Sequence, residues 1–299
     1  MLNQKTDSVE ITTQNEPEKN IELLAEHILS TDIDDIRQYS QTVSENILTE
    51  NQFETGILER VNSLSTGTMG IYYKNLRTEE TFEHNSIEIF PPASTFKIYT
   101  AILTLLSVEK KEFSLKNSIA LSQALYVPYG SVYTRANIGT DYMISDILYN
   151  MIAGSCNTGQ SMLFAKLTRD GIESRLTSEL GLTSTSLKDF KTTPKEMAQT
   201  LEKLYEGDIL TEEYRTLLIG LMNKSSTTDR IRAGLPKDAL VANKGGTLAG
   251  SKHDVAIVSS PNGDYILAIY TKDVNETEAV NIIKEISKTV WESNSQPLI

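Results

Sequence analysis

The sequence is poor in the residues that form disulfides, zinc sites and membrane spans. Its 299 residues include one cysteine, Cys156, which excludes an internal disulfide and a cysteine cluster for a metal. Three histidines (His27, His84 and His253) are scattered without ligand spacing, so we expect no metal and no other cofactor. No apolar run of about 18 residues is present, and the polar, acidic N-terminus has no signal-peptide pattern.

Positive charge is scarce too. The 28 Lys and Arg residues face 40 Asp and Glu residues, which gives a net charge of −12 at pH 7. Because no basic stripe is visible, this balance argues against nucleic acid as the main partner. Hydrophobic residues make up 39% and charged residues 23%, proportions that are ordinary for a soluble globular protein of one or two domains.

One stretch differs from this ordinary background. Residues 96–108 are apolar nearly all round, which predicts a helix buried inside a domain. The prolines at 91–92 cannot lie in a helix interior, so the helix is expected to begin near residues 93–94. Ser94 and Lys97 are spaced i and i+3, so they share one face at the helix start.

This pair of residues has two interpretations. In the structural one, Ser94 is an N-cap and Lys97 is a surface lysine whose stem lies along apolar groups. In the catalytic one, burial lowers the pKa of Lys97, which then serves as the base that a serine hydroxyl needs to become a nucleophile. The unpaired N–H groups of the helix start would hold an oxyanion.

The periodicity of the remaining chain predicts strands near both ends and helices in the middle. The expected strands are 69–76, 81–84, 241–247, 254–259 and 265–271. Helices are expected at 52–63, 212–223 and 276–292, and one passes through 162–167. Another helix is expected to be capped by Thr140 or Asp141 and to run to Gly154. A further helix is expected to be capped by Thr193, with Glu196 as its capping-box partner. Turns are expected at 77–80 and 261–264.

This order predicts a two-lobed α/β (α+β) fold, in which an antiparallel sheet flanked by terminal helices carries an inserted all-α lobe. The catalytic domain would cover 52–295, with an α/β lobe at 52–92 and 239–295 and a helical lobe at 93–238. Residues 1–18 are expected to be disordered. The whole segment 1–51 would be a tail or spacer that is partly disordered or helical.

Three short motifs follow one another along this framework: Ser94-Thr95-Phe96-Lys97, Ser155-Cys156-Asn157 and Lys244-Gly245-Gly246-Thr247. They resemble the S-x-x-K, S-D-N and K-T-G boxes of class A β-lactamases and penicillin-binding proteins. The segments Pro92-Ala93, Thr192-Thr193-Pro194 and 230–236 are also typical of class A sequences, so the resemblance covers about residues 52–295. It implies the β-lactamase/transpeptidase-like fold and a serine hydrolase that works through an acyl-enzyme.

The resemblance implies catalytic roles for three residues. Ser94 would attack a strained or peptide amide carbonyl, Lys97 would help take its proton, and Ser155 would relay that proton to the leaving nitrogen. The substrate-binding residues implied in the same way are Asn157, Lys244, Gly246, Thr247 and Arg230.

Within that set, Asn157 would bind the side-chain amide of the substrate and Lys97. Lys244 would supply positive charge for the substrate carboxylate, and Arg230 would support the binding of that carboxylate. The backbone N–H groups of Ser94 and Thr247 would form the oxyanion hole.

The sequence departs from the family pattern at three places. Cys156 replaces the aspartate of S-D-N, and we expect it to be a small buried side chain rather than a reactive thiol. Gly245 replaces the hydroxyl residue of K-T-G, so one hydrogen bond to the substrate carboxylate is lost unless Thr247 or Arg230 compensates. The interval from 157 to 192 has no E-x-x-L-N motif, whose glutamate activates the deacylating water in class A β-lactamases.

Other polar and aromatic residues near these motifs have simpler interpretations. Glu173 and Glu179 are expected to be solvated surface charges, and His253 is expected at the rim of the cleft rather than as a base. One of the tyrosines in the interval 126–133 is expected at the cleft entrance, but the sequence does not choose among Tyr126, Tyr129 and Tyr133.

These features predict an acyl-transferring serine hydrolase that acts on β-lactams or D-Ala-D-Ala stem peptides of peptidoglycan. Because the usual deacylation base is missing, slow, penicillin-binding or DD-peptidase-like behaviour is expected. The alternatives are a functional class A-type β-lactamase that uses another base, a glutaminase-type amidase, and a non-catalytic surface domain that retains the fold. The protein is expected to be an extracytoplasmic monomer, attached to a membrane only through an N-terminal anchor absent from this sequence.

Overall fold

The computed structural model describes residue 38 and residues 52–295. The spacer predicted over 1–51 therefore lies outside the described residues, apart from residue 38. The first described helix spans 52–62, close to the predicted 52–63. No helix among the described residues is long and apolar enough to cross a membrane.

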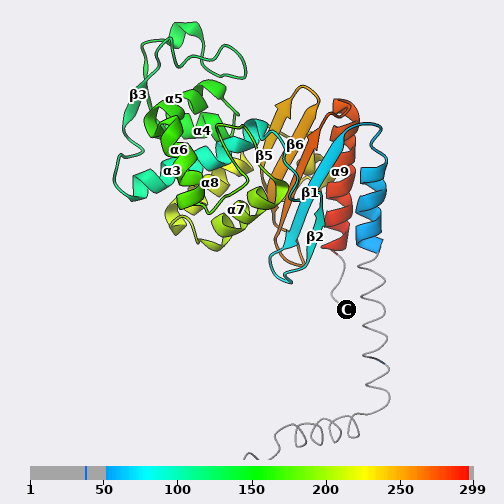
Figure 1. Ribbon diagram of the computed structural model, residues 1–299. Helices are drawn as coiled ribbons and strands as arrows, with labels where there is room; N and C mark the ends of the chain where they lie inside the picture. The colour runs from blue at the N-terminus through cyan, green and yellow to red at the C-terminus, as the bar shows by residue number, and fades with distance from the viewer. Residues whose placement is uncertain (1–37, 39–51, 296–299) are drawn as a thin grey trace, which may run out of the picture. The chain divides into compact units, whose positions relative to one another are not determined.

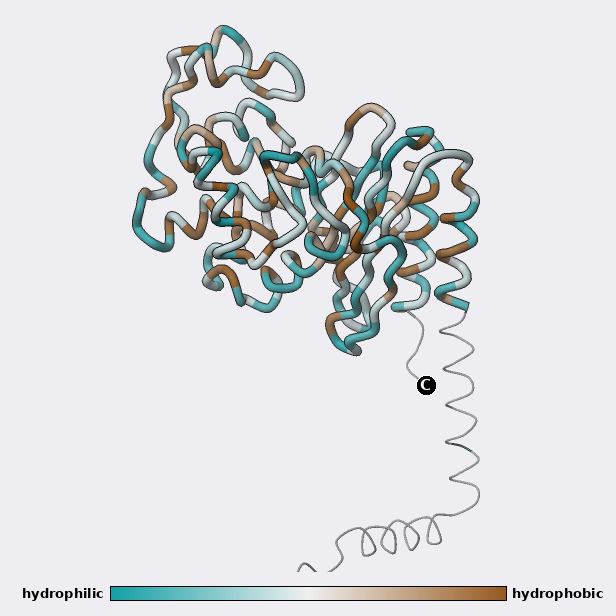
Figure 2. The backbone as a smooth tube through the Cα atoms, viewed as in Figure 1, coloured by the Kyte–Doolittle hydropathy of each residue, from teal (hydrophilic) through white to brown (hydrophobic). Residues whose placement is uncertain are grey.

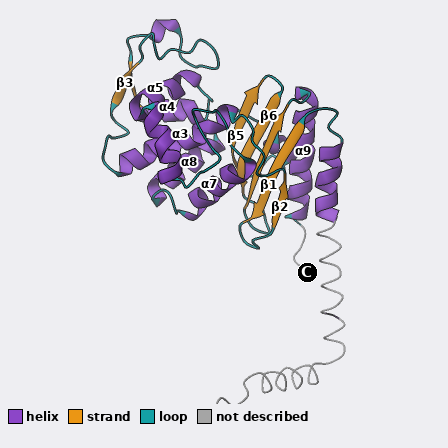
Figure 3. Ribbon diagram, viewed as in Figure 1, coloured by secondary structure: helices purple, strands orange, loops and turns teal. Residues whose placement is uncertain are grey.

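Five antiparallel strands form one sheet in the order β2-β1-β7-β6-β5 (Figure 3). The strands are β1 (Thr68–Asn75), β2 (Thr81–His84), β5 (Val241–Leu248), β6 (Ser251–Val258) and β7 (Tyr265–Lys272). β1 pairs with β7 along its whole length, so segments from the two ends of the domain are neighbours in the sheet. The predicted antiparallel sheet built from the first and last segments is thus confirmed.

Helices cover the two faces of this sheet (Figure 1). The labelled helices of the described chain are α3 (Phe96–Glu109), α4 (Ile144–Ile152), α5 (Asn157–Leu167), α6 (Arg169–Ser178), α7 (Pro194–Glu206), α8 (Glu212–Asn223) and α9 (Glu276–Ser293). Short 3-10 turns lie at Ala93–Thr95, Arg135–Asn137 and Ile231–Gly234. α9 packs on β6 and β7, whereas α7 packs on β1, β6 and β7 and α8 contacts β5. The predicted two-lobed mixed fold with an inserted helical part is confirmed.

The helical region contains two short strands that the sequence did not predict. β3 (Ser118–Ala120) pairs with β4 (Asp141–Met143) in a separate two-stranded sheet. The predicted cap at Thr140 or Asp141 is therefore wrong, because α4 begins only at Ile144. Three-residue strands are too short for an alternating pattern to register in the sequence.

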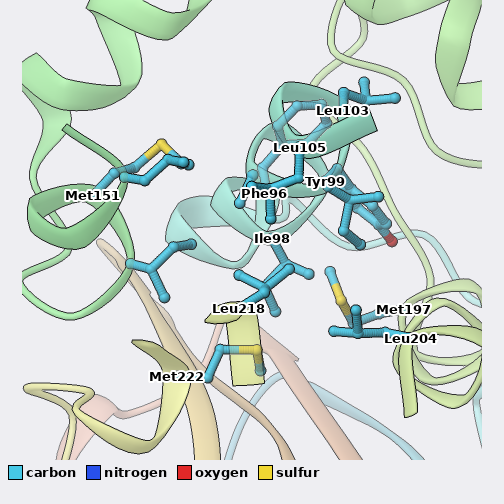
Figure 4. Packing of buried hydrophobic residues seen from close by; sticks show 14 of the residues in the cluster. Phe96, Ile98, Tyr99, Leu103, Leu105, Met151, Met197, Leu204, Leu218 and Met222 are labelled. Atoms are coloured by element: carbon cyan, nitrogen blue, oxygen red, sulfur yellow. The ribbon is translucent and has the colours of Figure 1, made fainter. Parts of the chain in front are cut away.

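The core of the helical lobe is built around α3. Twelve of its fourteen residues are buried, as the apolar run predicted. Phe96 and Ile98 belong to the same buried cluster as Met151 of α4 and Leu218 and Met222 of α8 (Figure 4). Figure 2 shows apolar residues along the strands and hydrophilic residues on many outer turns. This packing fixes the start of α3, where the sequence placed the serine and lysine, as a rigid edge of the lobe.

Candidate active site

Ser94 lies on a 3-10 turn, Ala93–Thr95, that leads directly into α3. No side-chain cap is made at either helix start, so the interpretation of Ser94 as an N-cap is wrong. Its hydroxyl instead accepts a hydrogen bond from Lys97 Nζ at 2.7 Å. Ala93, which precedes it, has a φ of 49°, a left-handed conformation that is strained for a residue with a Cβ. Such strain is typical of functional turns, where it aims the following side chain.

Lys97 is buried, with 1% of its surface exposed. Its Nζ also donates to Asn157 Oδ1 at 2.8 Å, so both hydrogen bonds go to neutral oxygens. Burial lowers the pKa of Lys97 to about 8, because the ammonium loses water without gaining a carboxylate partner. A large share of this lysine is therefore neutral near pH 8 and able to accept a proton.

The segment between α4 and α5 carries the second motif. Ser155 adopts a left-handed φ of 55°, and the Cys156 sulfur caps α5 by accepting from Gly159 N at 3.4 Å. Cys156 is fully buried, as predicted, and its sulfur makes the helix cap at this position. Asn157 is fixed by its backbone N–H, which donates to Gly130 O at 2.6 Å, and by Nδ2, which donates to Tyr129 O at 3.1 Å.

Lys244 approaches the same segment from β5. Its Nζ donates to Ser155 Oγ at 2.8 Å and to the carbonyl of Gly245 at 3.2 Å. Burial, together with the nearby charges of Lys97 and Arg230, lowers the pKa of Lys244 to about 7. The site thus holds two serine–lysine contacts, one in the helical lobe and one that joins the two lobes.

Glycines at 245 and 246 let β5 lie close to its neighbours. A Cβ on Gly246 would come within 3.0 Å of the Ala93 Cβ and 3.2 Å of the Pro92 carbonyl, so only glycine brings β5 this close to the Ser94 turn. A Cβ on Gly245 would come within 2.5 Å of Thr227 Cγ2 and 2.9 Å of Arg230 Nη1. The missing K-T-G hydroxyl therefore has a steric cause in this chain.

Arg230 is 5% exposed and is bonded mainly to the strands rather than open to solvent. Its Nη1 donates to the carbonyls of Gly246 at 3.0 Å and His253 at 2.7 Å, and its Nη2 donates to Thr247 Oγ1 at 2.7 Å. Gly246 and His253 face each other in the β5–β6 pair. Arg230 therefore orients the Thr247 hydroxyl and brings positive charge behind it.

A cleft of about 440 Å³ lies beside the Ser94 turn, and its lining includes Ser94, Lys97, Asn157 and Thr247. Ser155, Lys244, Gly246 and Arg230 lie outside this lining. Of the three candidate tyrosines, Tyr129 lines this cleft and is 71% exposed. Tyr133 is buried, and its hydroxyl accepts from Asn150 Nδ2 at 3.0 Å.

The cleft also contains residues that the sequence reasoning missed. On α5 these residues are Gln160, Ser161 and Phe164, and from a loop comes Phe190. The α5 residues lie three, four and seven positions after Asn157, which is the spacing of one helix face and would have identified them. Phe190 carries no comparable signal in the sequence.

Three predictions about charged residues are wrong. Glu173 is partly buried, and its carboxylate accepts from Ser186 Oγ at 2.7 Å, Leu187 N at 2.7 Å and Lys188 N at 3.1 Å. Glu179 is likewise partly buried and pairs with Arg175 and Lys110 rather than being solvated. The third wrong prediction concerns His253.

His253 is fully buried rather than at a rim. Its Nδ1 accepts from Thr271 N at 3.1 Å, and Nε2 lies 2.8 Å from the Pro91 carbonyl, so Nε2 carries the proton. Burial lowers the pKa of His253 to about 3. Both ring nitrogens are therefore occupied, and this histidine has no free lone pair for a reacting water.

Glu196 has a different partner from the one predicted. Thr193 caps α7 by accepting from Glu196 N at 3.1 Å, as expected, but the Glu196 carboxylate accepts from Thr183 N, Ser184 N and Thr185 Oγ1 at 2.6–2.8 Å. It therefore ties the loop before α7 to the helix. Among the described residues no cluster of His, Cys, Asp or Glu is suited to hold a metal ion.

A nucleophile-bearing turn, a buried lysine in contact with it, and a second serine–lysine pair that joins the lobes define a two-lobed serine hydrolase of the acyl-transfer type. A family model described as the Beta-lactamase enzyme family matches residues 53–293. The chain belongs to this family, and the predicted relationship to class A β-lactamases and penicillin-binding proteins is confirmed at the level of the superfamily.

Individual relatives are distant in sequence but similar in fold. A β-lactamase of Bacillus subtilis (strain 168) is 30% identical over 246 residues, which cover 74% of this chain and 78% of the relative. A mutant of PBP-A, solved as an acyl-enzyme complex with penicillin G, superposes with a TM-score of 0.76 at 24% identity over 81% of this chain and 96% of PBP-A. An ancestral class A β-lactamase superposes with a TM-score of 0.73 at 25% identity over 80% of this chain and 99% of its own.

Proposed function

We propose that this protein is a penicillin-binding serine enzyme that is acylated at Ser94 by β-lactams or by D-Ala-D-Ala-type peptides and releases the acyl group slowly. The observation that carries this proposal is the pair of contacts Lys97–Ser94 and Lys244–Ser155, at 2.7 and 2.8 Å, of which the first lines the cleft. A domain that had lost catalysis would have no need to keep both.

Acylation uses the groups in contact at the site. Neutral Lys97 takes the proton of the Ser94 hydroxyl as Oγ bonds to the amide carbonyl carbon. The negative charge that develops on the carbonyl oxygen is held by the backbone N–H groups of Ser94 and Thr247. When the C–N bond breaks, the Ser155 hydroxyl gives its proton to the leaving nitrogen. The proton that Lys97 took from Ser94 is passed to Ser155 Oγ in its place, so Lys97 is neutral again.

The two buried lysines, Lys97 and Lys244, are close enough for the charge of one to affect the other. The charge of Lys97 lowers the pKa of Lys244, so the pair resists carrying two full charges. A substrate carboxylate that binds at Lys244 stabilises the proton there. Lys97 is then the lysine that loses its proton as pH rises and serves as the base.

Slow release follows from the chemistry of the cleft. Within the described residues, its lining includes no aspartate, glutamate or histidine. Glu173 and Glu196 accept hydrogen bonds from loop backbone, and His253 has both ring nitrogens engaged. Neither of these two glutamates nor His253 is thus free to activate a water at the ester, and general-base assistance is typically worth about 10²–10⁴-fold.

A functional class A-type β-lactamase is the second candidate, because the curated relatives carry that name. It requires rapid hydrolysis of the Ser94 ester by another base. We further propose that the protein works outside the cytoplasm on cell-wall peptides, since D-Ala-D-Ala stems occur there.

Stopped-flow hydrolysis of nitrocefin, paired with intact-mass measurement of the quenched enzyme, separates the candidates. We expect a burst of about one equivalent, a slow steady state, and a covalent adduct on Ser94 that persists for minutes or longer, as the loss of general-base assistance implies. Rapid sustained turnover without a burst would favour the β-lactamase. Absence of any adduct and of any turnover would favour a non-catalytic domain.

A further inference from the structure

The space that a side chain at position 245 would fill is taken by Thr227. A Cβ built on Gly245 would lie 2.5 Å from Thr227 Cγ2 and closer still to Thr227 Oγ1. The Thr227 side chain, with its hydroxyl, therefore occupies the space that the side chain of a hydroxyl residue in a K-T-G box would enter. It comes from the loop between α8 and the Ile231–Gly234 turn, not from β5.

This loop is held to both lobes. Ser226 N donates to the carbonyl of Ala153, which follows α4 in the helical lobe, at 2.8 Å. Thr227 N donates to Ser225 Oγ at 3.2 Å, and the Thr227 carbonyl accepts from Asn243 Nδ2 on β5 at 3.0 Å. Thr227 is thus fixed between the strand that carries Lys244 and the chain segment that carries Ser155.

The Thr227 side chain is available to a ligand. The residue is partly exposed, and its hydrogen bonds within the described part of the chain use backbone atoms. A Cβ built at position 245 would also lie 2.9 Å from Arg230 Nη1. The Thr227 side chain and the Arg230 guanidinium therefore border the same small space. Alternation along β5 places positions 245 and 247 on one face, where Arg230 Nη2 also contacts Thr247 Oγ1.

We infer that the Thr227 hydroxyl donates a hydrogen bond to the substrate carboxylate, together with Thr247, and so replaces the hydroxyl that Gly245 lacks. The ligand group is a carboxylate on the carbon bonded to the scissile amide nitrogen. This inference rests on the proposed function, because it concerns the substrate of the same site. The specificity for an anionic substrate is then supplied in part by a loop outside the three motifs.

The test compares benzylpenicillin with its methyl ester, which has the same ring but no carboxylate. Acylation is followed by intact mass in wild type and in Thr227→Val, which keeps the shape of the side chain and removes the hydroxyl. We expect the second-order rate constant for benzylpenicillin to fall about 10- to 100-fold, as for a lost hydrogen bond to a charged group, and that for the ester to change less than about twofold. Thr227→Ser should stay near wild type, and the exposed neighbour provides the control Thr228→Ala.

A relocation experiment keeps the test decisive if Thr227→Val folds poorly. Thr227→Ala removes the two nearest of the atoms that crowd position 245 and leaves the flexible Arg230 guanidinium, so Thr227→Ala with Gly245→Ser should regain most of the lost rate with benzylpenicillin. Equal losses for the acid and the ester would mean that Thr227 only holds the loop, and an unchanged rate would mean that it holds nothing of importance. Either outcome overturns the inference while leaving the proposed function intact. The proposed function itself fails if wild type is never acylated, or if it turns over rapidly without a burst.

Discussion

Acylation of Ser94 is expected to accelerate steeply with pH. Burial lowers the pKa of Lys97 to about 8, and only the neutral amine accepts the serine proton. The neutral fraction is about 1% at pH 6 and about 50% at pH 8, so the limiting first-order acylation rate should rise about 50-fold over this interval. From pH 8 to 9 it should rise less than about twofold.

The choice of rate constant matters because Lys244 titrates in the same range, with a pKa lowered by burial to about 7. In the free enzyme, both lysines contribute to the pH dependence of the second-order constant. At saturating penicillin, the bound carboxylate keeps Lys244 charged, so the limiting rate reports Lys97. Quenched-flow intact-mass measurements at pH 6, 7, 8 and 9 supply both constants.

Variants complete the test. Lys97→Arg cannot lose its proton and should abolish acylation at every pH, whereas Lys284→Arg on the exposed face of α9 should retain the wild-type profile. A limiting rate that is flat from pH 6 to 8, or a Lys97→Arg variant that acylates at the wild-type rate, would refute the assignment of Lys97 as the base.

Four further outcomes are expected. Ser94→Ala should eliminate labelling by a fluorescent penicillin and change the free energy of unfolding by no more than about 1–2 kcal/mol, and persistent labelling would contradict its role. Lys244→Arg keeps the charge and should slow acylation less than Lys97→Arg does; an equal loss would contradict this. Glu173→Gln should lower the unfolding free energy by about 1–3 kcal/mol in chemical denaturation, because one acceptor oxygen that faces loop N–H groups becomes a donor. An unchanged denaturation midpoint would refute the role of Glu173 in holding this loop. His253 binds its proton in the unfolded chain near pH 6.5 but in the folded protein only near pH 3, so the free energy of unfolding should fall as pH falls through this window. His253→Asn should make this fall less steep. The same slope in wild type and variant would contradict the burial of His253.

Elements with strong periodicity were predictable from the sequence. The apolar run behind Ser94 gave α3, the turn residues at 261–264 separated β6 from β7, and α8 was predicted at its observed bounds, Glu212–Asn223. β3 and β4 were missed because their three residues pair with each other rather than follow a pattern. The motif residues were likewise found in sequence order, since their types and context are local properties.

Partners of charged side chains were not predictable in the same way. Glu173 on α6 accepts hydrogen bonds from a loop thirteen to fifteen residues later, and His253 is enclosed by residues from β7 and the segment before Ser94. A lone glutamate or histidine in a sequence carries no mark of such contacts. Its burial depends on which distant segments fold over it.

The sequence by itself determined the chemical groups of the site and the order of helices and strands that would carry them, because motif context and apolar periodicity are written along the chain. Only the tertiary structure decided their protonation and their distances. Lys97 meets Asn157 across 60 residues and Lys244 meets Ser155 across 89. The lowered pKa of each lysine arises from the water that these distant segments exclude, and the loop that places Thr227 beside Gly245 is fixed by contacts to both lobes.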